Sequence, residues 1–242
     1  IKDNLKTNRM KDFSNRYIFI FSVVMVVSVA ILLSLTALLL QPRQEKNVET
    51  EKKMNILSSI NITSTKVDAV ALYDRYITES FVINTGGQRL QGVDAFTVSL
   101  RAEHKKPLEQ QYLPVFTAVM DNGDTLHIFP LEGKGLWGPI WGYVALRPDM
   151  STIAGATFDH KGETPGLGAE INTTPFESQF LDKNLYEDGR FVSVAVVKGG
   201  ADKSDRHEVD GISGGTITSK ALEAMLREGL VKYEKYFDDN RR

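Results

Sequence analysis

An uncharged apolar run near the N-terminus most constrains what this chain can fold into. Residues 17–40 read YIFIFSVVMVVSVAILLSLTALLL, and none of these side chains is charged. As an α-helix this run spans about 36 Å, enough to cross the hydrocarbon core of a bilayer with some tilt. A cleaved signal peptide is the alternative, but its apolar region is shorter and a small-residue cleavage site follows it. We therefore expect a retained transmembrane helix over 17–40, closed by Pro42.

Basic residues flank this run on both sides. Lys2, Lys6, Arg9, Lys11 and Arg16 precede it, and Arg43, Lys46, Lys52 and Lys53 follow it. Positive charge concentrates on the cytoplasmic side of a membrane, whereas a large C-terminal domain is translocated regardless of its charge. The small N-terminal excess favours a cytoplasmic segment over 1–16, a stalk over 41–53 and an extracytoplasmic domain over 54–242.

Composition narrows the class of that domain. Roughly 185 residues follow the anchor, which is enough for one domain with a real core. The net charge of −2 disfavours a nucleic-acid partner. The chain has no cysteine, which excludes disulfides, iron–sulfur clusters and thiolate zinc sites.

The hydrophobic pattern of residues 54–242 indicates an α+β domain. Apolar runs at 113–120 and 125–129 flank Asn122-Gly123, the strongest hairpin signal in the chain, and runs at 141–146 and 152–158 predict a second hairpin. We also expect one or two helices over 54–79 bent near 61–65, strands at 81–84, 96–100 and 191–197, a polar loop at 103–111, a short helix at 175–181 and an amphipathic C-terminal helix. These elements predict a mainly antiparallel sheet with flanking helices.

The stretch DGISGGTITSK, residues 210–220, directly precedes this C-terminal helix pattern. Gly214 and Gly215 can adopt positive φ and allow close approach of a bulky group. The free N–H groups and the positive dipole end of the helix favour an anion. The Thr216 hydroxyl is therefore suited to hold a phosphate, either non-covalently or as an ester. An ordinary loop leading into a helix cap is the alternative interpretation of the same residues.

DGISGGTITS resembles the flavinylation motif Asp-x-x-Ser/Thr-Gly-Ala-Thr of the FMN-binding domain family. In that family a threonine carries FMN as a phosphoester, attached by a separate flavin transferase that uses FAD. Matched residue by residue, Asp210 is the motif acid, Ser213 the first hydroxyl, Gly214 the glycine and Thr216 the flavin-bearing residue. Gly215 departs from the motif because alanine is usual there. The resemblance implies covalent FMN on Thr216.

Two further stretches resemble signatures of the same family. GKGLWGPIWGYVAL at 133–146 and HKGETPGLGAEI at 160–171 combine glycines with bulky apolar residues. Such loops suit a shallow wall for a flat aromatic ligand, although tight connections between strands have the same composition. The resemblance implies that both loops contact the isoalloxazine ring. The expected cofactor-binding residues are Thr216, Asp210, Ser213, Gly214, Gly215, Thr218, Trp137, Glu163, Thr164, Gly166, Leu167 and Gly168.

With the anchor included, the whole chain resembles the family of C subunits of the sodium-translocating NADH:quinone oxidoreductase. The G subunit of the Rnf complex shares the motif and is the close competitor. The resemblance implies an electron-carrying member of a complex of six subunits, which couples electron flow from NADH to quinone with sodium export. It also implies a bacterial inner membrane protein with a periplasmic domain. We expect no NADH site on this chain, since the Gly-x-Gly-x-x-Gly fingerprint is absent.

Three other functions fit parts of the sequence. An anchored extracytoplasmic sensor domain would use the glycine-rich loops to hold a small anion or a peptide. An anchored hydrolase would use Thr216 with His207 and Asp210, although the sequence has no Gly-x-Ser-x-Gly elbow. A metal site would use His160, Glu163 and His207, but their spacing matches no metal motif. We expect both histidines to be solvated loop residues.

Overall fold

The computed structural model describes residues 14–241 and divides the chain into two units at Glu49/Thr50. The boundary falls within the predicted stalk. Lys2, Lys6, Arg9 and Lys11, four of the five basic residues of the predicted cytoplasmic segment, lie outside the described residues.

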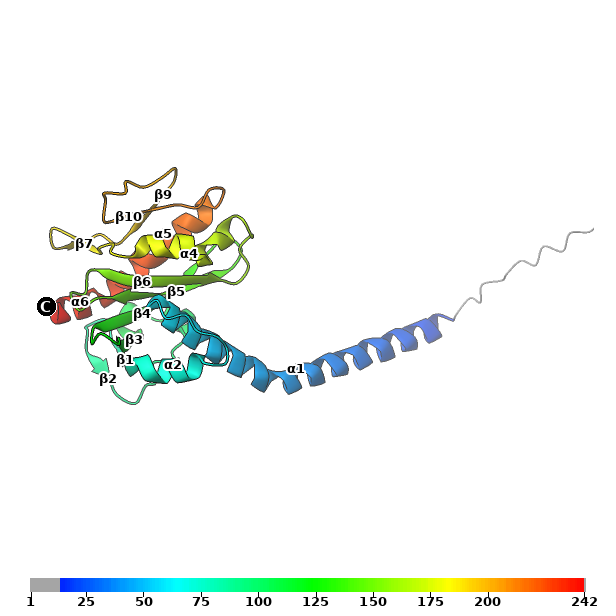
Figure 1. Cartoon of the computed structure of the whole chain (residues 1–242). Helices are drawn as coiled ribbons and strands as arrows, with labels where there is room; N and C mark the ends of the chain where they lie inside the picture. The colour runs from blue at the N-terminus through cyan, green and yellow to red at the C-terminus, as the bar shows by residue number, and fades with distance from the viewer. Residues whose placement is uncertain (1–13, 242) are drawn as a thin grey trace, which may run out of the picture. The chain divides into compact units, whose positions relative to one another are not determined.

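Helix α1, Asn15–Ser59, is 45 residues long and carries the apolar run (Figure 1). Large apolar side chains of 17–40 are between 41 and 77% exposed. The hydroxyls of Ser22 and Thr36 donate to the carbonyls four residues earlier, at 2.8 and 2.6 Å, so these polar groups are satisfied inside the helix. Pro42 lies within α1 and does not end it. The helix fits a single-pass membrane anchor by length and composition.

A six-stranded antiparallel sheet in the order β2-β1-β3-β4-β5-β6 forms the centre of the second unit. Its strands are β1 Ile77–Ile83, β2 Arg89–Leu90, β3 Leu113–Val119, β4 Thr125–Lys134, β5 Pro139–Leu146 and β6 Ile153–His160. Both predicted hairpins are confirmed: β3 pairs with β4 around Asn122-Gly123, where Gly123 has φ +86°, and β5 pairs with β6.

Shorter elements surround this sheet. They are α2 Ala69–Tyr76, α3 Leu100–Glu103, η1 Leu108–Gln110, η2 Gly168–Asn172, α4 Thr174–Glu177, η3 Ser178–Phe180, β7 Tyr186–Glu187, β8 Arg190–Phe191, β9 Ala195–Val197, β10 Glu208–Asp210, α5 Thr216–Leu230, η4 Val231–Tyr233 and α6 Glu234–Asn240. Of the one or two helices expected over 54–79 the structure has two, the end of α1 and α2, and the short helix expected over 175–181 corresponds to α4 and η3. The break between α1 and α2 contains Asn61 at φ +61°.

Two strand predictions are wrong. Residues 95–97 form a turn and Leu100 already begins α3, because Asp94 accepts hydrogen bonds from Phe96 N and from Thr97. Such local side-chain bonds compete with sheet pairing. The predicted strand over 191–197 is interrupted at Ser193, which has φ +66°, so β8 and β9 are separate.

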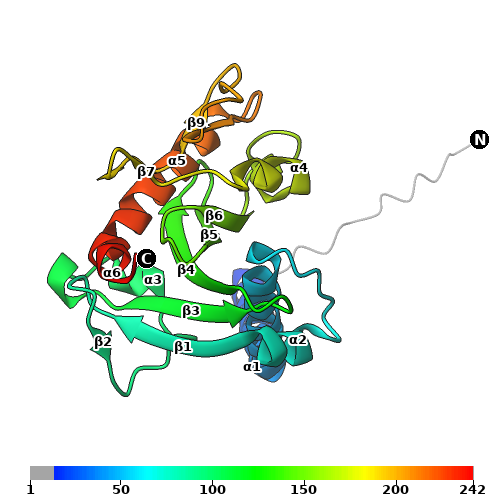
Figure 2. The same ribbon diagram turned by 60° about the vertical axis from the view of Figure 1, so that its left-hand side comes forward.

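Both faces of the sheet are covered, which is why β3 is buried at six successive positions and β4 at four, Ile128 to Leu131 (Figure 2). On one face, Phe129 and Leu131 of β4 pack with residues of α5 and α6. On the other face, Ile128 packs with Ile56 and Leu57 at the end of α1. One face therefore receives the C-terminal helices and the other receives the last turns of α1.

Two glycines let α5 lie close against β4. A Cβ atom on Gly133 would lie 2.8 Å from the Cβ of Met225, and one on Gly229 would lie 2.7 Å from Leu131 Cδ2. Larger residues at these two positions would push the helix away from the strand. The glycines thereby help to fix the position of α5 and of its first turn.

Candidate functional site

The first turn of α5 offers unpaired backbone donors. Gly214 has φ +74°, and Gly215 occupies the cap position without any side-chain capping bond. Within residues 14–241, the N–H groups of Thr216, Ile217 and Thr218 donate to no protein acceptor. A 15-residue helix that starts in this way favours an anion at its N-terminus.

The side chains of this turn divide by burial into two sets, which we call the outer face (Thr216 and Ile217) and the inner face (Thr218 and Ser219). Thr216 is half-buried and Ile217 is 60% exposed, whereas Thr218 is 1% exposed. On the inner face, the Thr218 hydroxyl donates to Glu163 Oε2 at 2.6 Å, and Ser219 Oγ accepts from Ile212 N at 3.0 Å. Among the described hydrogen bonds, none involves the Thr216 hydroxyl, so the outer face keeps its hydroxyl available.

The 160–171 stretch meets α5 through Glu163 and Leu167. Glu163 is 4% exposed, and its Oε1 accepts from the backbone N–H of Trp137 at 2.9 Å. A Cβ atom on Gly214 would lie 2.6 Å from Leu167 Cδ2, so the loop and the turn pack directly together. The structure therefore brings the three signature stretches close together.

Large apolar side chains around this place remain exposed to solvent. Leu136 and Trp137 of the first loop, Leu167 of the second and Ile217 of α5 are between 41 and 69% exposed. We call these four residues the apolar rim. Neighbouring exposed apolar side chains mark binding surfaces more often than chance allows. The rim fits the predicted wall for a flat aromatic ligand.

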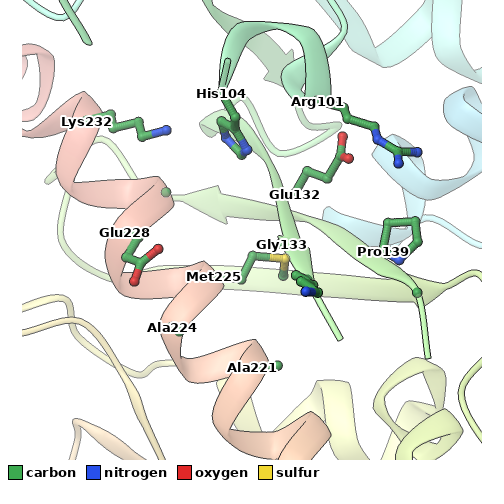
Figure 3. Close-up of a pocket in the computed structure, with 13 residues that line it drawn as sticks. Arg101, His104, Glu132, Gly133, Pro139, Ala221, Ala224, Met225, Glu228 and Lys232 are labelled. Carbon is green, nitrogen blue, oxygen red and sulfur yellow. The ribbon is translucent and has the colours of Figure 1, made fainter. Parts of the chain in front are cut away.

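A groove of about 700 Å³ runs along α5 on the side of the β4–β5 turn (Figure 3). This volume lies within the range of small-molecule sites. Its α5 wall carries Ala221, Ala224 and Met225, and Gly133 and Pro139 lie opposite. Ala221 follows Thr216 by five residues, about 7.5 Å along the helix axis. The same five residues turn the helix by about 500°, so Ala221 points about 140° away from Thr216 and the groove lies on another side of α5.

Charged groups lie at the far end of the groove. Burial lowers the pKa of His104, and the positive charge of Lys232 lowers it further, while Glu228 acts in the opposite direction. Burial also raises the pKa of Glu132, against the effect of Arg101. The groove is therefore lined by charges of both signs, with Arg101, Lys134 and Lys232 basic and Glu132 and Glu228 acidic.

The remaining predicted site residues have structural partners or are exposed. Asp210 ends β10, where its Oδ1 accepts from Ala201 N at 2.6 Å and its N–H donates to Gln179 at 2.8 Å. It thereby anchors the turn that follows β9. The carbonyl of Thr164 accepts from Leu167 N, and Gly166, at φ +74°, donates to Glu170. Ser213 and the Thr164 side chain are exposed.

Sequence reasoning missed Gly135 and the lining of the groove. A Cβ atom on Gly135 would lie 2.6 Å from Glu163 Oε1, so this glycine makes room for the carboxylate. Nothing in the local sequence indicates that contact. The groove left a detectable signal, because small residues recur at 221, 224 and 229 on α5 among larger ones.

The two histidines, expected to be solvated loop residues, are partly exposed and each has a protein partner, although His207 does lie in a turn. His160 ends β6, and its Nδ1 accepts a hydrogen bond from Glu163 N at 3.2 Å. His207 Nδ1 lies 2.7 Å from the carbonyl oxygen of Asn184. Both side chains are partly buried. Over the described part of the chain, no three His, Asp or Glu residues gather as a metal site would require.

The chain is similar to known proteins in sequence and in fold. The FMN-binding domain family matches residues 135–231. The C subunit of the Na(+)-translocating NADH-quinone reductase of Vibrio vulnificus strain YJ016 is 30% identical over 210 residues, which cover 80% of this chain and 82% of that protein. The protein of the same name from Pseudomonas aeruginosa PAO1 is 29% identical over 245 residues, 92% of this chain and 93% of that protein.

Two solved structures are also similar. The crystal structure of the C subunit of the Na(+)-translocating NADH-quinone reductase from Parabacteroides distasonis gives a TM-score of 0.75 at 42% identity, covering 82% of this chain and 96% of that one. The crystal structure of Shewanella oneidensis NqrC gives a TM-score of 0.69 at 25% identity, covering 79% and 96%.

Proposed function

The chain belongs to the family of C subunits of Na(+)-translocating NADH-quinone reductases, and on this premise we propose that it carries FMN as a phosphoester on Thr216. The observation that carries the proposal is the outer face of α5. There, within residues 14–241, a hydroxyl without a protein partner stands at the start of a helix whose first N–H groups are unpaired.

The turn before α5 fits the phosphate of the cofactor. Unpaired N–H groups of Thr216, Ile217 and Thr218 supply donors, and the helix dipole favours the negative charge. Gly214 takes a left-handed conformation that most residues avoid, and a side chain there would strike Leu167. The residues present therefore suit a phosphate ester at this position.

The apolar rim fits the ring of the cofactor. Its exposed side chains offer faces on which a flat ring packs. When bound, FMN supplies one- and two-electron redox chemistry. The chain's own residues hold it: the ester on Thr216 prevents its loss by dilution, and the open rim leaves an edge accessible for electron exchange.

A separate flavin transferase would transfer the FMN half of FAD to Thr216. The Thr216 oxygen forms a bond to the phosphorus of the FMN half, and the bond from that phosphorus to the AMP half breaks. The hydroxyl proton ends on AMP, the second product. Because the transferase must reach Thr216, the transferase and the domain lie on the same side of the membrane.

We place the domain in the periplasm, anchored by α1 in a bacterial inner membrane, as one of the six subunits of an NADH:quinone oxidoreductase. Within that complex the chain passes electrons on the route from NADH to quinone, coupled to sodium export. The length and exposure of α1 support the anchor. The names of the relatives above support this complex over an Rnf-type complex.

Expression with and without a flavin transferase tests the proposal. The denatured chain is run on a gel and inspected for flavin fluorescence, and its mass is measured. We expect fluorescence and a mass increase of one FMN less one water only when the transferase is present. Absence of the adduct under both conditions contradicts the proposal and favours an anchored sensor domain.

A further inference from the structure

Glu163 is a buried carboxylate that touches two other segments of the site. Its Oε1 accepts from Trp137 N at 2.9 Å, 26 residues earlier, and its Oε2 accepts from the Thr218 hydroxyl at 2.6 Å, 55 residues later. We infer that Glu163 is a positioning residue that joins these segments and orients the first turn of α5 before any cofactor arrives. The inference rests on the proposed function of Thr216 and assigns Glu163 a role other than ring contact.

Two glycines leave space for this carboxylate. A Cβ atom on Gly135 would lie 2.6 Å from Oε1, and one on Gly168 would lie 2.7 Å from Oε2 and 2.3 Å from Thr218 Oγ1. Neither glycine has positive φ, so backbone conformation does not explain its lack of a side chain. Both loops are thus shaped around the Glu163–Thr218 contact.

Burial of this carboxylate has no compensating ion pair. Glu163 is 4% exposed, and among the described residues no Lys, Arg or His forms a salt bridge with it. Burying a charged group is costly unless hydrogen bonds offset the cost. Here each oxygen accepts from a different segment, so the stabilisation depends on both segments being in place.

The contact determines which way Thr216 points. Side chains at 216 and 218 lie about 200° apart around a helix. When Thr218 is held against Glu163, Thr216 lies on the opposite side of the helix, where it lines a small pocket with Lys198 and Ile212. Glu163 therefore acts on Thr216 through Thr218, and the described hydrogen bonds include none between Glu163 and Thr216.

Substitutions at Glu163 separate hydrogen bonding from charge. Glu163→Gln keeps the side-chain volume: its Oε1 still accepts from Trp137 N, and its Nε2 donates to Thr218 Oγ1 in place of the reversed bond. Glu163→Ala removes both bonds. Thr218→Val removes only the hydroxyl and keeps the shape. Glu170→Gln alters another acceptor of the same loop, which binds Gly166 N, and serves as the matched control.

The first measurement uses the full chain in detergent without cofactor. Hydrogen exchange of the Trp137 amide is followed by NMR, and circular dichroism checks the overall fold. We expect exchange to accelerate at least about tenfold in Glu163→Ala and to stay within about threefold of wild type in Glu163→Gln and Glu170→Gln. If Glu163→Ala does not fold, Thr218→Val takes its place in the test. We expect the Trp137 amide to exchange faster in that variant too.

The second measurement is the initial rate of flavin transfer onto each variant by a flavin transferase with FAD. We expect a loss of at least about tenfold in Glu163→Ala and Thr218→Val, and near wild-type rates in Glu163→Gln and Glu170→Gln. Wild-type exchange and transfer in the folded Glu163→Ala or Thr218→Val chain would overturn the inference, as would a Glu163→Gln chain as impaired as Glu163→Ala. A wild-type chain that accepts no flavin contradicts the proposed function, while the amide exchange still decides the role of Glu163.

Discussion

The outer and inner faces of the first turn of α5 carry the same functional group in opposite surroundings. Thr216 is half-buried and its hydroxyl has no protein partner among the described residues, whereas Thr218 is fully enclosed and bonded to Glu163. The two residues are separated by a single position in the chain. Their difference arises because the helix turns by about 100° per residue.

This contrast shows how a short motif divides its roles. A buried hydroxyl bonded to a carboxylate stabilises the site but is inaccessible to a second protein. A hydroxyl at the exposed start of a helix is accessible and stands where a phosphate is stabilised. The chemistry proposed for Thr216 and the positioning inferred for Thr218 therefore follow from their surroundings rather than from residue type.

Thr216→Ala gives the largest expected effect. It removes the only oxygen proposed to carry the ester, so in-gel flavin fluorescence after co-expression with a transferase is expected to vanish. Thr216→Ser retains a hydroxyl and is expected to label in part. Thr218→Ser, the matched control, keeps the inner hydroxyl and should label fully. If Thr216→Ala keeps its fluorescence, the flavin is attached elsewhere and the role proposed for the outer face is wrong.

Thr218→Val is expected to affect stability as well as labelling. It leaves Glu163 Oε2 buried without its donor, which should lower the free energy of unfolding by about 1–3 kcal/mol. Thr216→Val should change it by less than about 0.5 kcal/mol, because Thr216 has no bond to lose. Denaturant titration of both variants measures the contrast. Equal losses would show that the inner face is no more structural than the outer face.

Gly215→Ala introduces the alanine usual in the family motif. Its Cβ would lie 2.9 Å from Ile212 Cγ2, so we expect a cost of about 1 kcal/mol. In Ile212→Ala the methyl group is gone and the same change should cost less, which a double-mutant cycle measures. Full flavin labelling is expected in Gly215→Ala, since Thr216 keeps its place. If the stability costs of Gly215→Ala and Ile212→Ala are additive, contact with Ile212 does not cause the cost of Gly215→Ala.

His104, at the far end of the groove, should give the smallest effect. Burial lowers its pKa in the folded chain, so the unfolded chain binds the proton more readily. Its contribution to stability is present above the unfolded pKa of about 6.5 and is lost as the pH falls below that value. Between about pH 7.5 and 5.5 the free energy of unfolding should fall less in His104→Gln than in wild type. Flavin labelling should be unchanged. An equal fall in both proteins would contradict a lowered pKa of His104.

The sequence predicted those parts of the fold that depend on local pattern. Asn122-Gly123 between apolar runs identified the central hairpin, and the spacing of Leu222, Leu226 and Leu230 identified α5. The strand expected at 96–100 failed because Asp94 bonds the backbone locally. Helical spacing also could not show that Pro42 would lie inside one continuous helix.

The candidate site was predictable in its segments but not in its contacts. Three glycine-containing stretches were identified, and the structure brings them together at Trp137, Glu163 and Thr218. The pairing of Glu163 with Thr218 joins residues 55 positions apart, which no local pattern encodes. The role of Gly135 likewise depends on an atom from a distant loop, and the groove depends on how α5 packs on β4.

Peptide mapping of the native protein, isolated from its own membrane, tests the central proposal most directly. After proteolysis, fragmentation mass spectrometry locates any modification within residues 210–220. The account predicts a mass increase of one FMN less one water, carried by Thr216 and absent from Thr218. An unmodified Thr216 in the native protein, or the flavin on Thr218, would contradict it.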